Sequence, residues 1–344
     1  MKIFYAVQAT GNGHISRAME ILPYLKQYGE VDIFLSGSNS SLRMETEIKY
    51  RSKGVCFFYN HSGSIGYAKT LKQLAPLRVF REARDLPVHQ YDLVINDFEF
   101  ITSLACAMRK IPSVNFGHHA SFRSDKVPRP EKKEAFGEWI LANFGRASQY
   151  IGLHFESYDD FILPPIIRKT IRRAEPMDKG HITVYLPAYS DEELERRFCK
   201  MNSRFEVFSR SLKQPLRIGN IRFLPVNQDA FTKSMTNSHA IICGAGFETP
   251  AEAMYLGKKL MVMPVKGQYE QKCNAAALQK MGVTVLDSLN DHFEPVFSKW
   301  MSEAAVIKIR PDHSTRAIVS YLMHCSHIRP ESDLDLLYPE WVIG

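Results

Sequence analysis

A histidine near the start of the chain stands where its ring could act as a base. Residues 8–14, Gln-Ala-Thr-Gly-Asn-Gly-His, follow a short apolar run and precede a helical pattern. Glycines let a backbone approach a ligand closely, and a helix N-terminus favours negative charge. We therefore expect Gly11, Asn12 and Gly13 to line a ligand site, with His14 in the first helical turn. The alternative is that His14 caps this helix or bonds to a loop carbonyl.

An aspartate further along the chain could orient that histidine. The apolar run 93–97 ends in Asp97 and predicts a buried strand. A carboxylate that holds the Nδ1 proton of an imidazole leaves Nε2 free to accept a proton. Asp97 could also cap the helix that follows, and the two roles can coexist. His118 and His119 end another predicted strand at the same sheet edge, so either could be the base, an acceptor contact or a loop residue.

A second glycine-rich turn lies in the other half of the chain. Residues 239–257 read as a buried strand, the turn Gly244-Ala245-Gly246-Phe247, and a helix. Thr249 is the expected N-cap of this helix, with Pro250 at its first position and Glu252 at the capping-box position. Backbone N–H groups of such a turn can hold a pyrophosphate without lysines.

The loop after the next predicted strand concentrates side chains that suit sugar hydroxyls. Glu270 and Gln271 stand together, and Asn274 follows three residues later. Ser190, in an earlier loop, either contacts a phosphate or forms an ordinary capping box with Glu193.

A parallel sheet in each half is needed to bring these residues together. Short apolar runs alternate with helical patterns along the whole chain, which is typical of βαβ units. The clearest helix is expected at 14–28, with Gly29 as its cap. Strands are expected at 3–7, 31–35, 55–59, 93–96, 113–116 and 150–154, then at 182–186, 205–208, 221–224, 240–243, 260–262 and 283–286.

This alternation predicts an α/β protein with two Rossmann-like doubly wound domains facing across a cleft, with ligands at the carboxyl ends of the strands. Adjacent prolines at 164 and 165 mark the linker. We expect an N-terminal domain at 1–165 and a C-terminal domain at 176–313. The terminal segment 314–344, with a helix at 314–327, is expected to return to the first domain, although it could be an ordinary last helix of the second.

Composition excludes several classes of protein. The 344 residues are 45% hydrophobic and 24% charged, as in soluble globular proteins. The six cysteines lie far apart without a C-x-x-C pair, which favours a reduced, cytoplasmic chain. No apolar run approaches the roughly 18 residues of a membrane span. A dinucleotide-binding dehydrogenase is disfavoured because Ser16 replaces its third glycine, and no Gly-Lys-Ser/Thr follows as a P-loop needs.

The charge balance points to an anionic partner. The formal net charge is +7, and residues 1–170 hold 22 basic and 17 acidic residues against 22 and 20 in the rest. Nucleic acid is disfavoured because the basic residues are spread without interleaved aromatic residues. A phosphorylated or lipid-linked acceptor, or peripheral contact with an anionic membrane at its inner face, is the preferred explanation.

Taken together, these motifs resemble those of GT-B glycosyltransferases, the superfamily of plant and macrolide UDP-glycosyltransferases and of the lipid-linked N-acetylglucosaminyltransferase. The resemblance implies that Glu252 binds the ribose hydroxyls and that the pair Glu270-Gln271 binds the donor sugar, with Asn274 nearby. It also implies that His14 is the base and Asp97 its partner acid. The lipid-linked branch lacks that acid, so Asp97 favours the other branches.

The sequence departs from this pattern at the phosphate site. Gly244 stands where plant-type enzymes place a histidine on the β-phosphate, so phosphate contact would fall to backbone N–H groups and to Ser190. Phe223, in the segment 223–226, would meet the nucleobase largely through backbone. The acceptor would lie on the N-terminal domain, on the segments 54–77 and 115–133.

The activity implied is inverting, metal-independent transfer of a sugar from a nucleotide-diphosphate donor, a UDP-sugar, with no cofactor. The motif Asp333-Leu334-Asp335 would then be a surface element and not a metal site. Two alternatives remain open at this stage: an NDP-sugar 2-epimerase or hydrolase of the same fold, and a non-catalytic nucleotide-sugar-binding protein.

Overall fold

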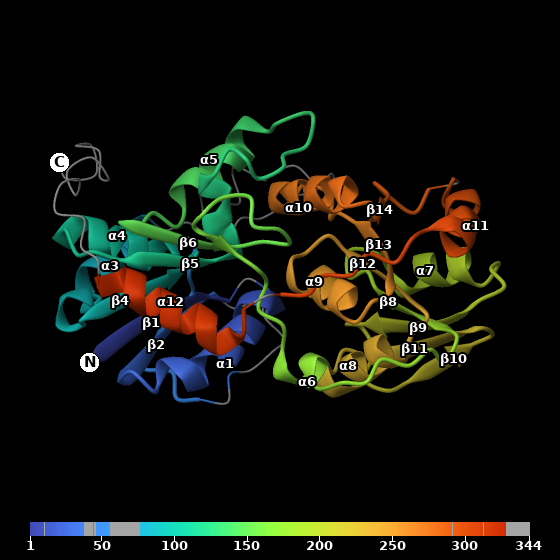
Figure 1. Cartoon of the computed structure of the whole chain (residues 1–344), viewed down its shortest axis with the longest axis horizontal. Helices are drawn as coiled ribbons and strands as arrows, with labels where there is room; N and C mark the ends of the chain where they lie inside the picture. Colours follow the sequence, from blue (N-terminus) through green and yellow to red (C-terminus); the bar gives the residue numbers. More distant parts are fainter. Residues whose placement is uncertain are drawn as a thin grey trace. The chain divides into compact units, whose positions relative to one another are not determined.

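The computed structural model describes residues 1–9, 11–37, 44, 46–55, 76–290, 292–311 and 313–327 (Figure 1). It divides into two compact units, described separately below. Unit 1 comprises Met1–Val127, Lys133–Ile166 and the chain from Pro311, and unit 2 comprises Pro128–Lys132 and Ile167–Arg310. Each unit has a largely parallel sheet with helices between its strands, which confirms the predicted α/β class.

The sheet of unit 1 is parallel throughout its described strands. Its order is β3-β2-β1-β4-β5-β6-β7. The strands are β1 (Lys2–Gln8), β2 (Glu30–Ser36), β3 (Tyr50–Ser52), β4 (Leu93–Asp97), β5 (Val114–Gly117), β6 (Gln149–Leu153) and β7 (Ile162–Leu163). Because β1 lies between β2 and β4, the strand order reverses at the β1–β4 pair. Open α/β sheets bind ligands at the carboxyl ends of the strands beside such a reversal.

The helices of unit 1 are short. They are α1 (Asn12–Leu25), α3 (Pro76–Asp85), α4 (Phe100–Arg109), α5 (Ala135–Asn143) and α12 (Thr315–His327), with the 3-10 turns η1 (Val88–Gln90) and η2 (His118–Arg123). In Figure 1, α12 is the red helix, and it contacts α1. Its inner face buries Ile318, Val319, Leu322 and Met323, so the helix is held by apolar contact.

For unit 1, the bounds of the first helix were wrong, strands β3 and β7 were not predicted, and the expected strand 55–59 is not tested. Helix α1 begins two residues before His14 and ends at Leu25, three residues before the predicted end. Its last turn contains Pro23, which has no N–H to continue the helical bonds. Strand β7 was missed because it is only two residues long, and most of the expected strand 55–59 lies outside the described residues.

Unit 2 repeats the doubly wound plan with one antiparallel edge. Its order is β10-β11-β9-β8-β12-β13-β14. The strands are β8 (His181–Tyr185), β9 (Arg204–Ser209), β10 (Leu216–Ile218), β11 (Ile221–Pro225), β12 (Ala240–Gly244), β13 (Lys259–Met263) and β14 (Thr284–Val285). The unpredicted β10 pairs antiparallel with β11 through a turn at Gly219, whose φ of 56° suits glycine. The reversal of strand order falls between β8 and β12.

The helices of unit 2 enclose an aromatic core. They are α6 (Lys169–Arg172), α7 (Asp191–Phe198), α8 (Gln228–Asn237), α9 (Glu248–Tyr255), α10 (Tyr269–Lys280) and α11 (Phe293–Glu303). Phe198 stacks on Phe205 at 4.5 Å between ring centroids, and Phe293 and Trp300 belong to the same buried cluster. Among the described residues of either unit, no helix is long and apolar enough to cross a membrane.

Candidate functional site

The structure brings His14 and Asp97 together at the carboxyl edge of the unit 1 sheet. His14 is the third residue of α1, and Asp97 ends β4, opposite Val7 of β1. The His14 Nδ1 atom lies 2.8 Å from Asp97 Oδ1. The Asp97 side chain is 1% exposed and that of His14 is 12% exposed, so the ring still reaches solvent. This geometry permits Nδ1–H to donate to the carboxylate and leaves Nε2 available for a proton.

Arg17 is a third member of this cluster that the sequence analysis missed. Its Nη2 atom lies 2.7 Å from Asp97 Oδ1 and 2.9 Å from Oδ2, and its Nε donates to Oδ2 at 3.2 Å. The same Nη2 lies 3.0 Å from His14 Nδ1. Burial raises the pKa of Asp97, but the charge of Arg17 and the contact with His14 outweigh it and lower the pKa to about 2. The available signal was spacing, because residues three apart share a helix face.

A glycine at the end of β5 leaves the space that Asp97 and Arg17 occupy. Gly117, at the end of β5, has a φ of 141°, and a Cβ there would lie 2.9 Å from Asp97 Oδ1 and 3.1 Å from Arg17 Nη2. A side chain at this position would displace the ion pair. Gly117 therefore provides both an unusual backbone conformation and the space for Asp97 and Arg17.

The two histidines after β5 have different surroundings. The His119 ring stacks between Phe98, at 3.8 Å, and His14, at 5.2 Å between centroids. His118 is buried, and its Nδ1 lies 3.0 Å from the carbonyl oxygen of Leu153 in β6. Thus His119 belongs to the cluster around His14, whereas His118 contacts the neighbouring strand.

The second expected role of Asp97, capping the next helix, is wrong. Glu99 takes that role for α4, because its carboxylate accepts from the backbone N–H groups of Ile101 at 3.0 Å and Thr102 at 2.6 Å. Ser36, at the end of β2, also donates to Glu99 at 2.8 Å. Burial raises the pKa of Glu99, and these hydrogen bonds offset only part of that effect.

In unit 2, the predicted sugar-binding residues of α10 pack against the glycine-rich turn after β12. Asn274 Nδ2 donates to the carbonyl oxygen of Ala245 at 3.0 Å and to Glu270 Oε1 at 3.4 Å. Gln271 Oε1 accepts from the backbone N–H of Val265 at 2.9 Å. A Cβ on Gly244 would lie 3.5 Å from that same oxygen. The two segments are thus joined by polar contacts, of which the one between Asn274 and Ala245 is buried.

Gly246 and Gly11 share a property that their local packing does not explain. Neither has a positive φ, and a Cβ at either position would meet no atom of the described residues within 4 Å. Neither conformation nor packing therefore requires glycine there. Their open surroundings fit a ligand that approaches the backbone closely.

Helix α9 begins at Glu248, two residues earlier than expected. Thr249 is therefore inside the first turn and is not the N-cap, and Phe247 holds that position without a side-chain cap bond. Pro250 is the third helical residue, where no intrahelical N–H bond is required. The predicted capping-box role of Glu252 is likewise wrong, because its carboxylate is engaged elsewhere.

Glu252 forms a buried, two-bond ion pair with Arg168. Arg168 Nε and Nη2 donate to the two carboxylate oxygens, each at 2.6 Å. Arg168 Nη1 also donates to Thr232 of α8 at 3.2 Å. Arg168 follows the predicted proline linker, and nothing in its sequence neighbourhood announced a partner 84 residues away. The Glu252 side chain is 4% exposed, so this ion pair lies almost entirely out of contact with solvent.

The remaining predicted donor contacts have structural roles. Ser190 caps α7 by accepting from the N–H of Glu193 at 3.2 Å, as its alternative interpretation required. Phe223 is 1% exposed in the core, so its side chain does not reach a ligand. Asp333 and Asp335 lie outside the described residues, as does most of the segment 54–77. Within the described ranges, no three His, Cys, Asp or Glu side chains gather as a metal site would require.

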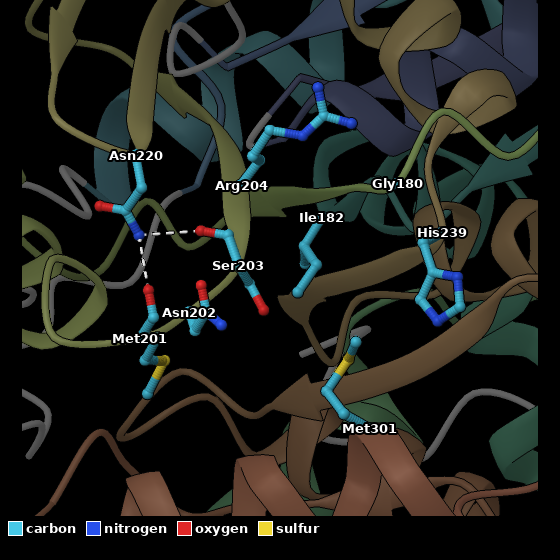
Figure 2. A pocket seen from close by; sticks show the side chains of 9 residues that line it. All are labelled: Gly180, Ile182, Met201, Asn202, Ser203, Arg204, Asn220, His239 and Met301. Carbon is cyan, nitrogen blue, oxygen red and sulfur yellow. Dashed lines mark hydrogen bonds between the residues drawn. The ribbon is translucent and has the colours of Figure 1, made fainter.

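A hollow of about 460 Å³ lies at the opposite end of the unit 2 sheet (Figure 2). It is lined by residues at the amino ends of β8, β9 and β12, including Gly180, Arg204 and His239. Asn220 spans one side and donates to the carbonyl oxygens of Met201 and Ser203, at 2.9 and 2.8 Å. None of the predicted site residues lines this hollow.

Comparisons with known proteins agree with this architecture. The model of a family described as glycosyl transferase family 1 matches residues 1–299. No curated protein gives a significant match to the sequence. Among solved structures, Arabidopsis thaliana UGT89C1 complexed with UDP is 14% identical with a TM-score of 0.56, covering 99% of this chain and 98% of its own.

Two bacterial structures are similar to the same extent. The glycosyltransferase SnogD from Streptomyces nogalater is 14% identical with a TM-score of 0.53, covering 94% of this chain and 99% of its own. Acinetobacter baumannii MurG is 13% identical with a TM-score of 0.52, covering 98% of each chain. At such identities the likeness concerns the fold, and it confirms the predicted GT-B architecture.

Proposed function

Because the chain belongs to glycosyl transferase family 1, and is therefore a glycosyltransferase, we propose that it transfers a sugar from a UDP-sugar to a hydroxyl group of its acceptor, with inversion and without a metal. The observation that carries the proposal is the His14–Asp97 contact of 2.8 Å at the switch point of the unit 1 sheet. The solved relatives with bound UDP or UDP-L-rhamnose support the choice of UDP.

In this reaction, His14 would supply the base. With its Nδ1 proton held by Asp97, Nε2 takes the proton of the acceptor hydroxyl as the oxygen attacks the anomeric carbon. Attack from the face opposite the leaving diphosphate inverts that carbon. The stacked His119 ring would fix the plane of His14 and border the acceptor hydroxyl.

Unit 2 would supply the donor site. The turn around Gly246 and the N-terminus of α9 would hold the diphosphate through backbone N–H groups, because no side chain fills the space there. Glu270 and Gln271 would bind hydroxyls of the sugar, whereas the buried Asn274 would hold Glu270 and the turn in place. Glu252 would contact the ribose.

A thermal-shift screen against UDP-, dTDP- and GDP-sugars tests the donor assignment. We expect UDP-sugars to raise the melting temperature and the other two classes to do so less. Gly246→Ala should remove this shift without lowering the stability of the unliganded protein, because its methyl group enters open space. A shift retained in that variant would contradict the proposed diphosphate site.

Loss of the His14 ring tests the base assignment. His14→Ala should reduce turnover by roughly 10²- to 10⁴-fold, the usual value of general-base assistance, and leave donor affinity nearly unchanged. His89→Ala, which removes an exposed histidine of the same unit, is the matched control and should keep parental turnover. Near-parental activity in His14→Ala would refute the assignment.

Two further assays separate the proposal from its alternatives. Incubation with UDP-N-acetylglucosamine alone should give no 2-epimer, since formation of that product without an acceptor would identify an epimerase. Treatment with a chelator should leave transfer intact, and its abolition would identify a metal-dependent enzyme. Acceptors that carry a phosphate or a lipid diphosphate are the first to test, because residues 1–170 hold 22 basic and 17 acidic residues.

A further inference from the structure

The buried cluster in unit 1 contains one cation more than a histidine–carboxylate pair needs. Arg17 bonds both oxygens of Asp97, while His14 bonds one of them. The side chains of Arg17 and Asp97 are 3% and 1% exposed, so water screens their charges little. The arginine must therefore be included in any account of how His14 holds its proton.

The charges of Asp97 and Arg17 act on His14 in opposite directions. A carboxylate alone beside His14 would attract a proton onto the ring, because protonation would then create a buried ion pair. With Arg17 already paired to Asp97, the carboxylate is neutralised before His14 is protonated. A proton on His14 then adds a net positive charge beside the guanidinium, 3.0 Å from Nδ1.

We propose that Arg17 is a positioning residue that offsets the charge of Asp97 beside His14, while still leaving one Asp97 oxygen to accept the Nδ1 proton. This proposal rests on the proposed function only in making His14 the base. The charge argument itself concerns the geometry of three side chains and Gly117.

The tautomer of His14 follows from the same arrangement. Nδ1 lies within hydrogen-bond distance of both Asp97 Oδ1 and Arg17 Nη2, and it cannot donate to one and accept from the other at once. Asp97 can only accept, whereas Arg17 Nη2 already donates to Asp97 at 2.7 Å. The Nδ1–H tautomer gives Asp97 its hydrogen bond from His14 and places the lone pair on Nε2.

Other groups that face the cluster are accounted for. Tyr5 of β1 is buried beneath it, and burial followed by the charge of Asp97 raises the pKa of its hydroxyl, so Tyr5 stays neutral. His119 of η2 stacks on the His14 ring, and Gly117 of β5 contributes only backbone. Within the described part of unit 1, Asp97 from β4 and Arg17 from α1 are the charged side chains that contact His14.

The test is the titration of His14 followed by NMR of ¹³C-labelled histidine, with the His14 signal assigned by its absence in His14→Gln. Arg17→Gln removes the cation and should move the midpoint of the His14 titration to higher pH by about one to two units, the size expected for one nearby buried charge. Asp97→Asn removes the anion and should move it to lower pH. Arg17→Lys retains the charge and should leave the midpoint within about half a unit of the parent.

The proposal predicts that the His14 midpoint rises in Arg17→Gln and falls in Asp97→Asn. A merely structural role of Arg17 predicts lost stability but no opposite shifts of this midpoint. The matched control is Arg84→Gln, which removes a cation from an exposed ion pair of unit 1 and should not move the midpoint. If Arg17→Gln fails to fold, the double variant Arg17→Gln/Asp97→Asn, which leaves neither charge of the pair buried alone, should have a higher His14 midpoint than Asp97→Asn. An unmoved midpoint in Asp97→Asn, or an upward shift in Arg17→Lys, would overturn the proposal.

The pH dependence of UDP release from UDP-N-acetylglucosamine or UDP-glucose separates this inference from the proposed function. If the acid limb of that profile follows the NMR midpoint across the variants, both stand. If the midpoint moves as expected and the acid limb does not, His14 is not the base, yet the role of Arg17 in its titration stands. If the midpoint does not move, the inference fails whatever the activity does.

Discussion

The Asp97 carboxylate should make unit 1 sensitive to acid in a way that one substitution removes. Its pKa falls from the ordinary value of 3.8 to about 2, since Arg17 and His14 together outweigh the effect of burial. One pKa unit corresponds to about 1.4 kcal/mol, so this shift contributes about 2 kcal/mol to the stability of the folded state. Because the folded pKa is the lower one, that stability is present above about pH 4 and is lost as the pH falls from about 4 to about 2.

Asp97→Asn cannot carry the charge and leaves Arg17 buried without its anion. Removing one partner of a buried ion pair costs about 3–5 kcal/mol, which we expect for unit 1 at pH 7. At about pH 2 the parent has lost about 2 kcal/mol of its own, so the difference between parent and variant should shrink by that amount. Urea unfolding curves of the parent and of Asp97→Asn, measured from pH 7 down to about pH 2, give the free energies of unfolding that are compared.

Hydrogen exchange of peptides from β1 and β4 assigns the unfolding transition to unit 1. Asp85→Asn is the control, because Asp85 forms an exposed ion pair with Arg84 and such pairs contribute at most about 1 kcal/mol. Its effect should be small and nearly constant with pH. The reasoning is refuted if the difference between the parent and Asp97→Asn is the same at pH 7 and at about pH 2.

Three other predictions concern residues that the structure buries or exposes. Glu252→Gln should destabilise unit 2 by about 3–5 kcal/mol, whereas the double variant with Arg168→Met should recover most of that loss, and additive effects in urea unfolding would contradict the pairing. Burial raises the pKa of the Glu99 carboxyl in the folded protein, so the parent loses stability as the pH rises through that raised pKa. Glu99→Gln has no carboxyl to ionise, so its free energy of unfolding, relative to that of the parent, should be higher at pH 7 than at pH 4. Iodoacetamide should label the exposed Cys199 in the native protein and spare Cys106, whose pKa burial raises to about 12, as peptide mass mapping would show.

The fold could be predicted well because hydrophobic alternation is a local signal. Each predicted strand of unit 2 overlaps an observed one, since buried parallel strands read as apolar runs bounded by turns. The strands that were not predicted, β3, β7 and β10, are two or three residues long. Strand β10 is an exposed edge of three residues, and β7 has only two.

Helix starts were less predictable because several residues compete for the capping position. Thr249 and Pro250 matched a familiar N-terminal pattern, yet the chain turns into α9 two residues earlier and leaves that end without a side-chain cap. Helix α4, in contrast to α9, does have a side-chain cap, but from an unexpected residue. Glu99 caps the helix, although aspartate is the more usual capping residue and Asp97 stood two positions away. Asp97 was unavailable for capping because Arg17 and His14 hold it.

The pairing of buried acids with distant residues also explains what the sequence could not reveal about the site. Two of the three predicted acids, Asp97 and Glu252, are held by arginines that lie 80 and 84 residues away in the chain. A buried carboxylate that stays charged needs a close cation or hydrogen-bond donors, because these offset the cost of removing the charge from water. A sequence shows which acid is buried at a strand end or on a helix, but it does not show which of 44 basic residues meets it. For a predicted acid at the edge of a parallel sheet, the structure therefore adds the identity of the paired arginine. That arginine decides how much of the acid's charge is left to act on a neighbouring base or ligand.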